Sequence, residues 1–161
     1  MARPKRLVLG LGNRLVGDDG FGSAVIEMLR ARPDLPANVE LVDAHTDLLA
    51  HVETLGSYDD VVLVDAVIDG SGSPKPNGEG GGSPGDVAVV NEETFMRWPE
   101  TSPSCHQISP LVAVKLFRAL QPRATTRITL VALHADVLRV GPGVAASAVV
   151  AGAEAVVRLV S

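Results

Sequence analysis

The stretch from Leu7 to Gly22 constrains the fold more than any other part of this 161-residue chain. It begins with the apolar run Leu7 to Leu9, bounded by glycine, which is typical of a strand buried on both faces in a parallel sheet. Gly10 and Gly12 then allow a tight turn and a close approach of the backbone. After the turn, apolar residues recur at helical spacing, at Phe21, Ala24, Val25, Met28 and Leu29. The stretch therefore predicts a strand, a turn and a helix.

Two carboxylates stand where that helix is expected to begin. Asp18 and Asp19 follow Gly17, and a carboxylate there can cap free backbone N–H groups and oppose the helix dipole. In open α/β sheets this carboxyl edge of the strands is also where ligands bind. A dinucleotide-binding fold is disfavoured, because Leu15 replaces the third glycine of its motif and carboxylates repel a pyrophosphate. Asp18 and Asp19 are thus either helix-start charges or part of a ligand site.

A further carboxylate lies near the end of the most apolar run of the chain. Residues 61–67 predict a central strand, and Asp65 is its single charge. A buried carboxylate without a partner is costly, so Asp65 requires either a structural hydrogen bond to a neighbouring loop or a role in binding or catalysis. Because Asp65 is expected at the same sheet edge as Asp18 and Asp19, we favour the functional interpretation.

The remaining pattern predicts one domain over residues 1–161. We expect further strands over 39–43, 87–90 and 127–133, with the strand at 87–90 at or near the sheet edge. Helices are expected over 47–56, 91–98 and 144–160, and after His106, where the apolar face comprises Ile108, Leu111, Val112, Leu116, Ala119 and Leu120. This order predicts an α/β fold of three layers (α/β/α), in which a mostly parallel twisted sheet of about five strands has helices on both faces.

The segment 69–86 differs from the rest of the chain in composition. Thirteen of its eighteen residues are Gly, Ser or Pro, a composition that cannot bury enough apolar surface to order itself. We therefore predict a mobile loop within the domain, since too little chain precedes it for a linker. Because this loop leaves the strand that carries Asp65, we expect it to border the ligand cleft at the carboxyl edge of the sheet.

Composition narrows the functional classes. Hydrophobic residues make up 46% of the chain and aromatic residues 3%, which suits a Val/Leu/Ala/Ile core around a parallel sheet. The net charge of −5 gives a nucleic-acid partner little electrostatic support, and the single cysteine excludes an intrachain disulfide. The apolar run behind the basic N-terminal residues is too short for a signal peptide, and no run reaches the ~20 residues of a membrane span. We expect a cytoplasmic monomer with no membrane partner.

A histidine precedes the third expected helix. His106 lies in a loop or first helical turn, from which its ring can project towards a site, although a lone histidine is more often structural. The adjacent Cys105 raises the possibility of a thiol protease. Neighbouring residues rarely aim at one atom, however, and no local motif supports that interpretation. The zinc motif H-E-x-x-H and the serine-hydrolase motif G-x-S-x-G are also absent.

Taken together, these motifs resemble those of the hydrogenase maturation proteases, endopeptidases that trim the C-terminus of the large subunit of nickel–iron hydrogenases. The matching segments are Gly10-Leu11-Gly12-Asn13 with Asp18-Asp19-Gly20, then Val64-Asp65-Ala66, then Cys105-His106-Gln107. Their order and separations match across nearly the whole chain. Two features depart from the family pattern. A D-G-G-T segment is common after the second strand, where this chain has Asp43-Ala44-His45-Thr46, and the long glycine-rich loop is not typical.

The resemblance implies that Asp19, Asp65 and His106 are both the metal ligands and the catalytic residues. Two carboxylates and one imidazole leave a coordination position for water or substrate, as in catalytic metal sites. This donor set is not selective for nickel, so we infer that Ni²⁺ arrives on the substrate's thiolates, while other divalent ions can occupy the site in isolation. Cleavage would use either metal-activated water or local polarisation of the scissile carbonyl.

The expected reaction is removal of the C-terminal extension of a nickel–iron hydrogenase large-subunit precursor after nickel insertion, with the substrate-held nickel used for recognition. The alternative is a non-cleaving binding or chaperone module of the same fold that recognises a metal-loaded partner. A different peptidase on this fold is a third possibility. Incubation with nickel-loaded precursor separates cleavage from binding alone.

Overall fold

The computed structural model describes residues 3–68, 83–98, 109–135 and 143–161. Five strands form one sheet in the order β2-β1-β3-β5-β4. Their bounds are β1 Arg6–Leu11, β2 Val39–His45, β3 Asp60–Ile68, β4 Val87–Asn91 and β5 Arg127–Ala135. Neighbouring strands are parallel except β4, which pairs with β5 in antiparallel register at the sheet edge. The mostly parallel sheet, the central position of β3 and the edge position of β4 are confirmed.

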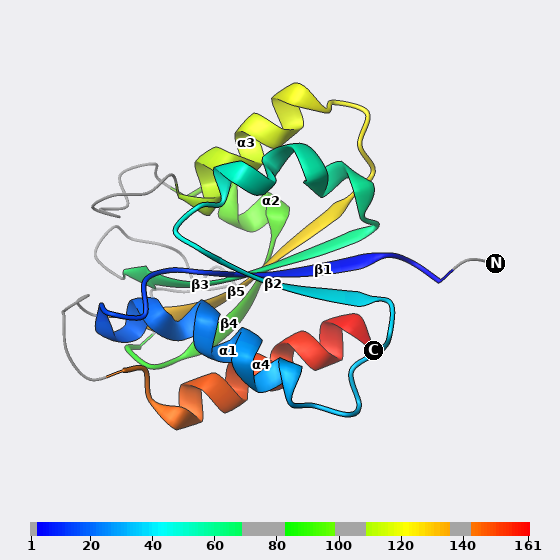
Figure 1. The fold of residues 1–161 in the computed structure, drawn as a ribbon. Coiled ribbons are helices and arrows are strands. Elements are labelled where there is room, and N and C mark those ends of the chain that lie inside the picture. The colour runs from blue at the N-terminus through cyan, green and yellow to red at the C-terminus, as the bar shows by residue number, and fades with distance from the viewer. Residues whose placement is uncertain (1–2, 69–82, 99–108, 136–142) are drawn as a thin grey trace.

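Helices cover both faces of the sheet (Figure 1). On one face lie α1 Phe21–Arg30 and α4 Ala146–Val160, which pack against each other. On the other face lie the 3₁₀ helix η2 Leu49–Ser57 and the helices α2 Glu92–Phe95 and α3 Pro110–Leu120. The predicted three-layer α/β/α fold is therefore confirmed.

The sheet is buried on both sides because its strands are apolar at consecutive positions. In β1, Leu7 and Leu9 belong to the core beneath η2 and α3, while Val8 belongs to the core beneath α1 and α4. In β3, Leu63 faces the α3 side and Val64 the α1 side. This alternation follows from the two-residue period of a strand. Because Asp65 lies two residues after Leu63 in β3, its side chain points to the α3 side as well.

The sequence pattern predicted the existence of α3 but only part of its buried face, since Leu111 is buried as expected. Of the residues expected to face the core, Val112, Leu116 and Leu120 are exposed, whereas the fully buried residues include Val114 and Phe117. Helical spacing alone is satisfied by both sets, and the set that packs on the sheet includes the large Phe117 ring. The helix begins at Pro110 because Ser109 accepts a hydrogen bond from the Val112 amide at 3.3 Å.

Other local expectations were largely confirmed. Asp47 accepts a hydrogen bond from the Ala50 amide at 3.1 Å, although the segment that follows is a 3₁₀ helix. Asn91 caps α2 through the Thr94 amide at 2.9 Å. The last helix begins at Ala146, two residues later than expected. Residues 83–86 form a turn that hydrogen-bonds to the backbone of His134, and the mobility of the rest of 69–86 lies outside the described residues.

Candidate active site

The strand order places the carboxyl ends of β1 and β3 side by side. The chain runs from β1 to β2 on one side of β1 and then returns to β3 on its other side. The strand order thus changes direction between β1 and β3, and we call this point the β1–β3 reversal. The crevice at such a point is the usual ligand site of an open α/β sheet. Asp19 lies in η1 Gly17–Gly20, which follows β1, and Asp65 lies near the carboxyl end of β3. The two predicted carboxylates therefore meet at this reversal.

Two glycines allow η1 and the start of α1 to sit directly on the sheet. Gly12 has a φ of 116°, and a Cβ atom there would overlap the carbonyl oxygen of Asp19. A Cβ atom at Gly22 would overlap backbone atoms of Leu11 and Val64. Larger side chains at these positions would push η1 away from β1 and β3. The predicted close approach of the backbone at the Leu7–Gly22 stretch is thus confirmed.

The carboxylate of Asp19 is held by the turn that precedes it. It accepts a hydrogen bond from the Asn13 amide at 2.8 Å, and no side-chain cap is present on η1 or α1. The expected side-chain cap is therefore absent, and for Asp19 the reason is that the turn amide takes its carboxylate; both Asp18 and Asp19 do lie in the first turn of η1, where a carboxylate can oppose the helix dipole. Burial raises the pKa of Asp19 above its ordinary value, and the Asn13 hydrogen bond opposes that rise.

Asp65 has a more perturbed carboxyl group. Burial, followed by the charge of Asp19, raises its pKa to about 8, while a hydrogen bond from the Ala66 amide at 2.9 Å opposes the shift. The side chain keeps partial contact with solvent, yet dense surrounding protein removes most of its hydration. Within the described residues its donor is this adjacent amide, and none of the described loop residues supplies the expected structural hydrogen bond.

The third predicted ligand, His106, lies outside the described residues, as does Cys105. Within the described ranges, no group of three His, Cys, Asp or Glu side chains is arranged to hold a metal ion. The ligand set Asp19, Asp65 and His106 therefore stays a prediction. The electrostatics of the described pair nevertheless suit a cation, because two neighbouring carboxylates both have raised pKa values, and the described residues give neither of them an ion pair.

A carboxylate that sequence reasoning left without a role lies at the end of β2. The Asp43 side chain accepts hydrogen bonds from Ser23 Oγ at 2.7 Å and from the Arg14 guanidinium at 3.1 Å. It also accepts one from the His45 amide at 3.2 Å. Burial raises the pKa of Asp43, but these donors outweigh burial, so its net pKa is lowered. Its position near the carboxyl end of a strand, like that of Asp65, was the available signal.

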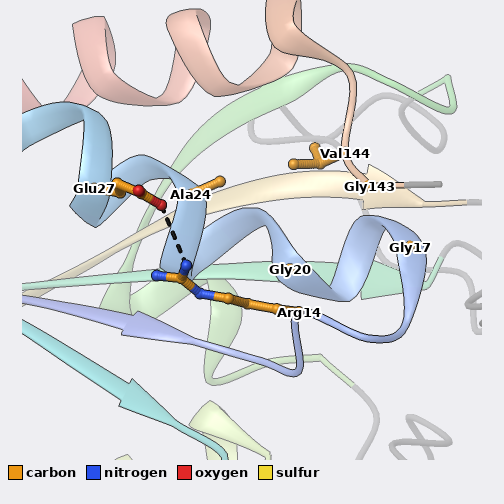
Figure 2. Close-up of a pocket in the computed structure, with 7 residues that line it drawn as sticks. All are labelled: Arg14, Gly17, Gly20, Ala24, Glu27, Gly143 and Val144. Atoms are coloured by element: carbon orange, nitrogen blue, oxygen red, sulfur yellow. Dashed lines mark hydrogen bonds and ion pairs between the residues drawn. The ribbon is translucent and has the colours of Figure 1, made fainter. Parts of the chain in front are cut away.

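A shallow pocket of about 170 Å³ lies on the α1–α4 side of η1, not between the two carboxylates. Figure 2 shows Arg14 reaching across to Glu27, with which it forms a 3.2 Å ion pair beside the pocket. The lining is mostly small residues, and it includes neither Asp19 nor Asp65. We therefore place the candidate site at the β1–β3 reversal, where the perturbed carboxylates are, and not in this pocket.

The fold matches that of a class of endopeptidases. A family model described as hydrogenase maturation protease matches residues 23–157. The chain therefore belongs to the hydrogenase maturation protease family and is a peptidase, which confirms the resemblance and the enzyme class predicted from the motifs. The matched region contains Asp65 and His106 but begins after Asp19, so the case for Asp19 rests on its geometry.

Solved structures agree on the fold. The chain is similar to the hydrogenase maturating endopeptidase HybD from Escherichia coli, with 22% identity, a TM-score of 0.72, and coverage of 96% of this chain and 91% of that one. It is also similar to the [NiFe] hydrogenase maturation protease HybD from Thermococcus kodakarensis, with 20% identity, a TM-score of 0.73, and coverage of 98% and 99%. No curated protein sequence matches the chain. Among the described helices, none has the length and apolarity required to cross a membrane.

Proposed function

We propose that this peptidase removes the C-terminal extension of a nickel–iron hydrogenase large-subunit precursor and recognises the nickel that the precursor already holds. The proposed metal-contacting and catalytic residues are Asp19, Asp65 and His106. The observation that carries the proposal is the pair Asp19 and Asp65 at the β1–β3 reversal, whose pKa values are both raised. The family relation supports a large-subunit precursor as the substrate class.

The carboxylate pair favours a cation that arrives with the substrate. The charge of Asp19 disfavours ionisation of Asp65, so the fully ionised pair is costly in the free protein. A divalent ion brought by the precursor would remove that cost and favour the ionised pair. Two carboxylates and one imidazole from three separate segments, without a thiolate, select poorly for free nickel. The isolated protein is therefore expected to hold nickel weakly and to bind the metal-loaded precursor well.

The backbone around the site orients both carboxylates before the substrate binds. The Asn13 amide holds the Asp19 carboxylate, and the Ala66 amide holds Asp65 Oδ1. With its pKa near 8, Asp65 retains a proton at neutral pH until a cation or a donor displaces it. When bound, the substrate's nickel ion supplies Lewis acidity close to the scissile peptide. Binding of the loaded precursor should therefore release protons, which titration calorimetry in buffers of different ionisation enthalpy measures.

The test compares nickel-loaded and metal-free precursor, with the product mass read by mass spectrometry. We expect cleavage of the loaded form and an intact metal-free form, and removal of the substrate's nickel ligands should abolish cleavage. Asp19→Asn should lose activity, whereas Asp18→Asn, which changes the adjacent acid, is the matched control and should retain it. Equal cleavage of both precursor forms would contradict the nickel-reading role and leave a different peptidase mechanism.

Other outcomes of the same assay address the remaining alternative. Precursor that is bound but left whole would support the non-cleaving binding or chaperone module in place of the processing reaction. The monomeric state, the cytoplasmic location and the absence of nucleic-acid and membrane partners also stay predictions. Size-exclusion chromatography with light scattering measures the first of these directly.

A further inference from the structure

His134 is a buried histidine of β5 that the proposed reaction does not use. The residue is 1% exposed, and its Nδ1 atom has no hydrogen-bond partner in the described part of the chain. Within the described ranges, Trp98 Nε1 is the other buried side-chain atom in this state. A polar atom that is buried without a partner destabilises a fold. An imidazole kept in such a position is a reason to look for the group that it contacts when the protein works.

The backbone of His134 is fixed without help from the ring. Its amide donates a hydrogen bond to the Asp86 carbonyl at 2.8 Å, and its carbonyl accepts one from the Gly85 amide at 2.8 Å. In the register of β3 and β5, His134 is the partner of Val67. All of these contacts belong to the main chain, so another side chain at position 134 would keep them. The strand therefore does not require an imidazole here.

The sheet places His134 close to Asp65. Asp65 is the partner of Ala132 in the β3–β5 register, and His134 follows Ala132 by two residues. Because Ala132 belongs to the core on the α3 side, alternation along β5 directs the His134 side chain to that same side, where Asp65 also points. Two residues along a strand and one spacing between strands separate the two Cα atoms by about 8 Å. Diagonal neighbours at this separation are within reach of aromatic and long side chains.

The Asp65 carboxyl group has an unused oxygen that could accept a hydrogen bond from this ring. Its Oδ1 atom accepts from the Ala66 amide at 2.9 Å, and no described residue donates to its Oδ2 atom. Carboxylates that bind metal ions are usually oriented by hydrogen bonds from neighbouring groups. An imidazole Nδ1–H group is a suitable donor, and a carboxylate partner favours the proton on that nitrogen. The two groups are thus complementary on one face of the sheet.

We propose that His134 is a positioning residue whose Nδ1–H group donates a hydrogen bond to Asp65 Oδ2 when Asp65 contacts a metal ion. The inference rests on the proposed function, because it takes Asp65 as a metal-contacting residue. His134 is not itself a metal ligand here, since Asp19, Asp65 and His134 do not form a group that could hold an ion. The hydrogen bond would keep the Asp65 carboxylate in one orientation, and with it the position of the ion relative to the scissile peptide.

The first experiment observes the hydrogen bond by NMR, in protein with isotope-labelled histidine and with Zn²⁺ as the probe ion. We expect an Nδ1–H signal of His134 that is protected from solvent exchange to appear when Zn²⁺ is added to the wild type. Its loss in His134→Leu assigns the signal. It should also be absent from Asp65→Ala, which removes the acceptor. A wild-type spectrum without the signal, or the same signal in Asp65→Ala, would overturn the proposal.

The second experiment compares cleavage of nickel-loaded precursor by the wild type, His134→Leu and His134→Asn. Leucine fills the site without a polar atom, whereas asparagine keeps an N–H donor near the position of Nδ1. We expect kcat to fall about 10-fold or more in His134→Leu, with KM within about 2-fold, and to recover to within about 3-fold of the wild type in His134→Asn. Because leucine removes an unpaired buried atom, the melting temperature of His134→Leu should equal or exceed that of the wild type.

The control is His51→Leu, which makes the same substitution in η2 and should leave kcat unchanged. An unchanged kcat in His134→Leu would contradict the positioning role. A lower melting temperature in His134→Leu, with no recovery of kcat in His134→Asn, would assign the ring to packing instead. Failure of the proposed function is distinguishable, because a wild type that leaves nickel-loaded precursor whole would remove the cleavage reaction, while the NMR signal would still decide whether His134 positions Asp65.

Discussion

Asp43 and Asp65 stand near the carboxyl ends of two parallel strands of the same sheet, yet their environments shift their pKa values in opposite directions. Asp43 accepts hydrogen bonds from a hydroxyl, a guanidinium and a backbone amide, and its pKa is lowered despite burial. Among the described residues, the donor to Asp65 is its neighbouring amide. Burial and the like charge of Asp19 raise the pKa of Asp65 to about 8.

The difference distinguishes a carboxylate with structural partners from the carboxylate that we propose to act in processing. Asp43 has its charge compensated within the protein, and it joins β2 to α1 and to the turn after β1. Asp65 stores an electrostatic cost that the described residues do not offset, and perturbed groups of this kind concentrate at functional sites. The comparison predicts that amide substitutions at the two positions have opposite effects on stability and unequal effects on activity.

The largest expected effect is on processing by Asp65→Asn. The amide keeps the shape of the carboxylate but removes the charge and one anionic ligand, so cleavage of nickel-loaded precursor should fall by about 100-fold or more. The rate is measured by mass spectrometry, with Asp43→Asn as the matched comparison. Near wild-type cleavage by Asp65→Asn would contradict a role of the Asp65 carboxylate in processing.

The same variant should gain stability at neutral and higher pH. The folded protein keeps a proton on Asp65 up to about pH 8, whereas the unfolded chain releases it near pH 4. The unfolded state then binds fewer protons between these values, so wild-type stability falls as pH rises through this window. At pH 8 we expect Asp65→Asn to be more stable by up to about 5 kcal/mol, a rise of about 10–20 °C in Tm. This advantage should vanish near pH 4, as thermal melts at both pH values would show.

Asp43→Asn should have the opposite effect on stability. Because the folded-state pKa of Asp43 is lowered, its charge stabilises the protein above the ordinary pKa, and the contribution is lost as pH falls through the folded-state value. Loss of the charged acceptor should cost about 2 kcal/mol at pH 7. Denaturant melts at pH 7 and pH 3 measure the effect, which should shrink at the lower pH. An Asp43→Asn protein as stable as the wild type would contradict the prediction that the charge of Asp43 stabilises the fold.

The smallest expected effect is that of Ser23→Ala. Ser23 is fully buried in α1, and its hydroxyl donates to Asp43 Oδ1 at 2.7 Å. Removing this donor should cost about 1 kcal/mol and raise the pKa of Asp43, which moves its acid transition to higher pH. The measurement is the fall in the free energy of unfolding as the pH is lowered, which is the acid limb of the stability curve. The matched control is Ser57→Ala, which removes an exposed hydroxyl at the end of η2 and should leave that limb in place.

Much of the fold could be predicted from the sequence because the relevant signals are local. The apolar runs at Leu7 and Val61 predicted buried strands, and the spacing from Phe21 to Leu29 predicted α1. Local patterns failed where two sets of residues had equal helical spacing, as in α3, whose buried face includes Phe117 in the core that it shares with the strands. They also failed at Asp19, where a turn amide competes with the helix start for the carboxylate.

The sequence by itself determined the element types, the α/β class and the positions of the carboxylates after their strands, since short-range periodicity and turn residues control these. Only the tertiary structure decided the strand order, which brings Asp19 beside Asp65 and gives Asp43 its donors Ser23 and Arg14. The physical reason is that a pKa depends on every charge and dipole within a few ångströms, and those neighbours come from segments far apart in the chain.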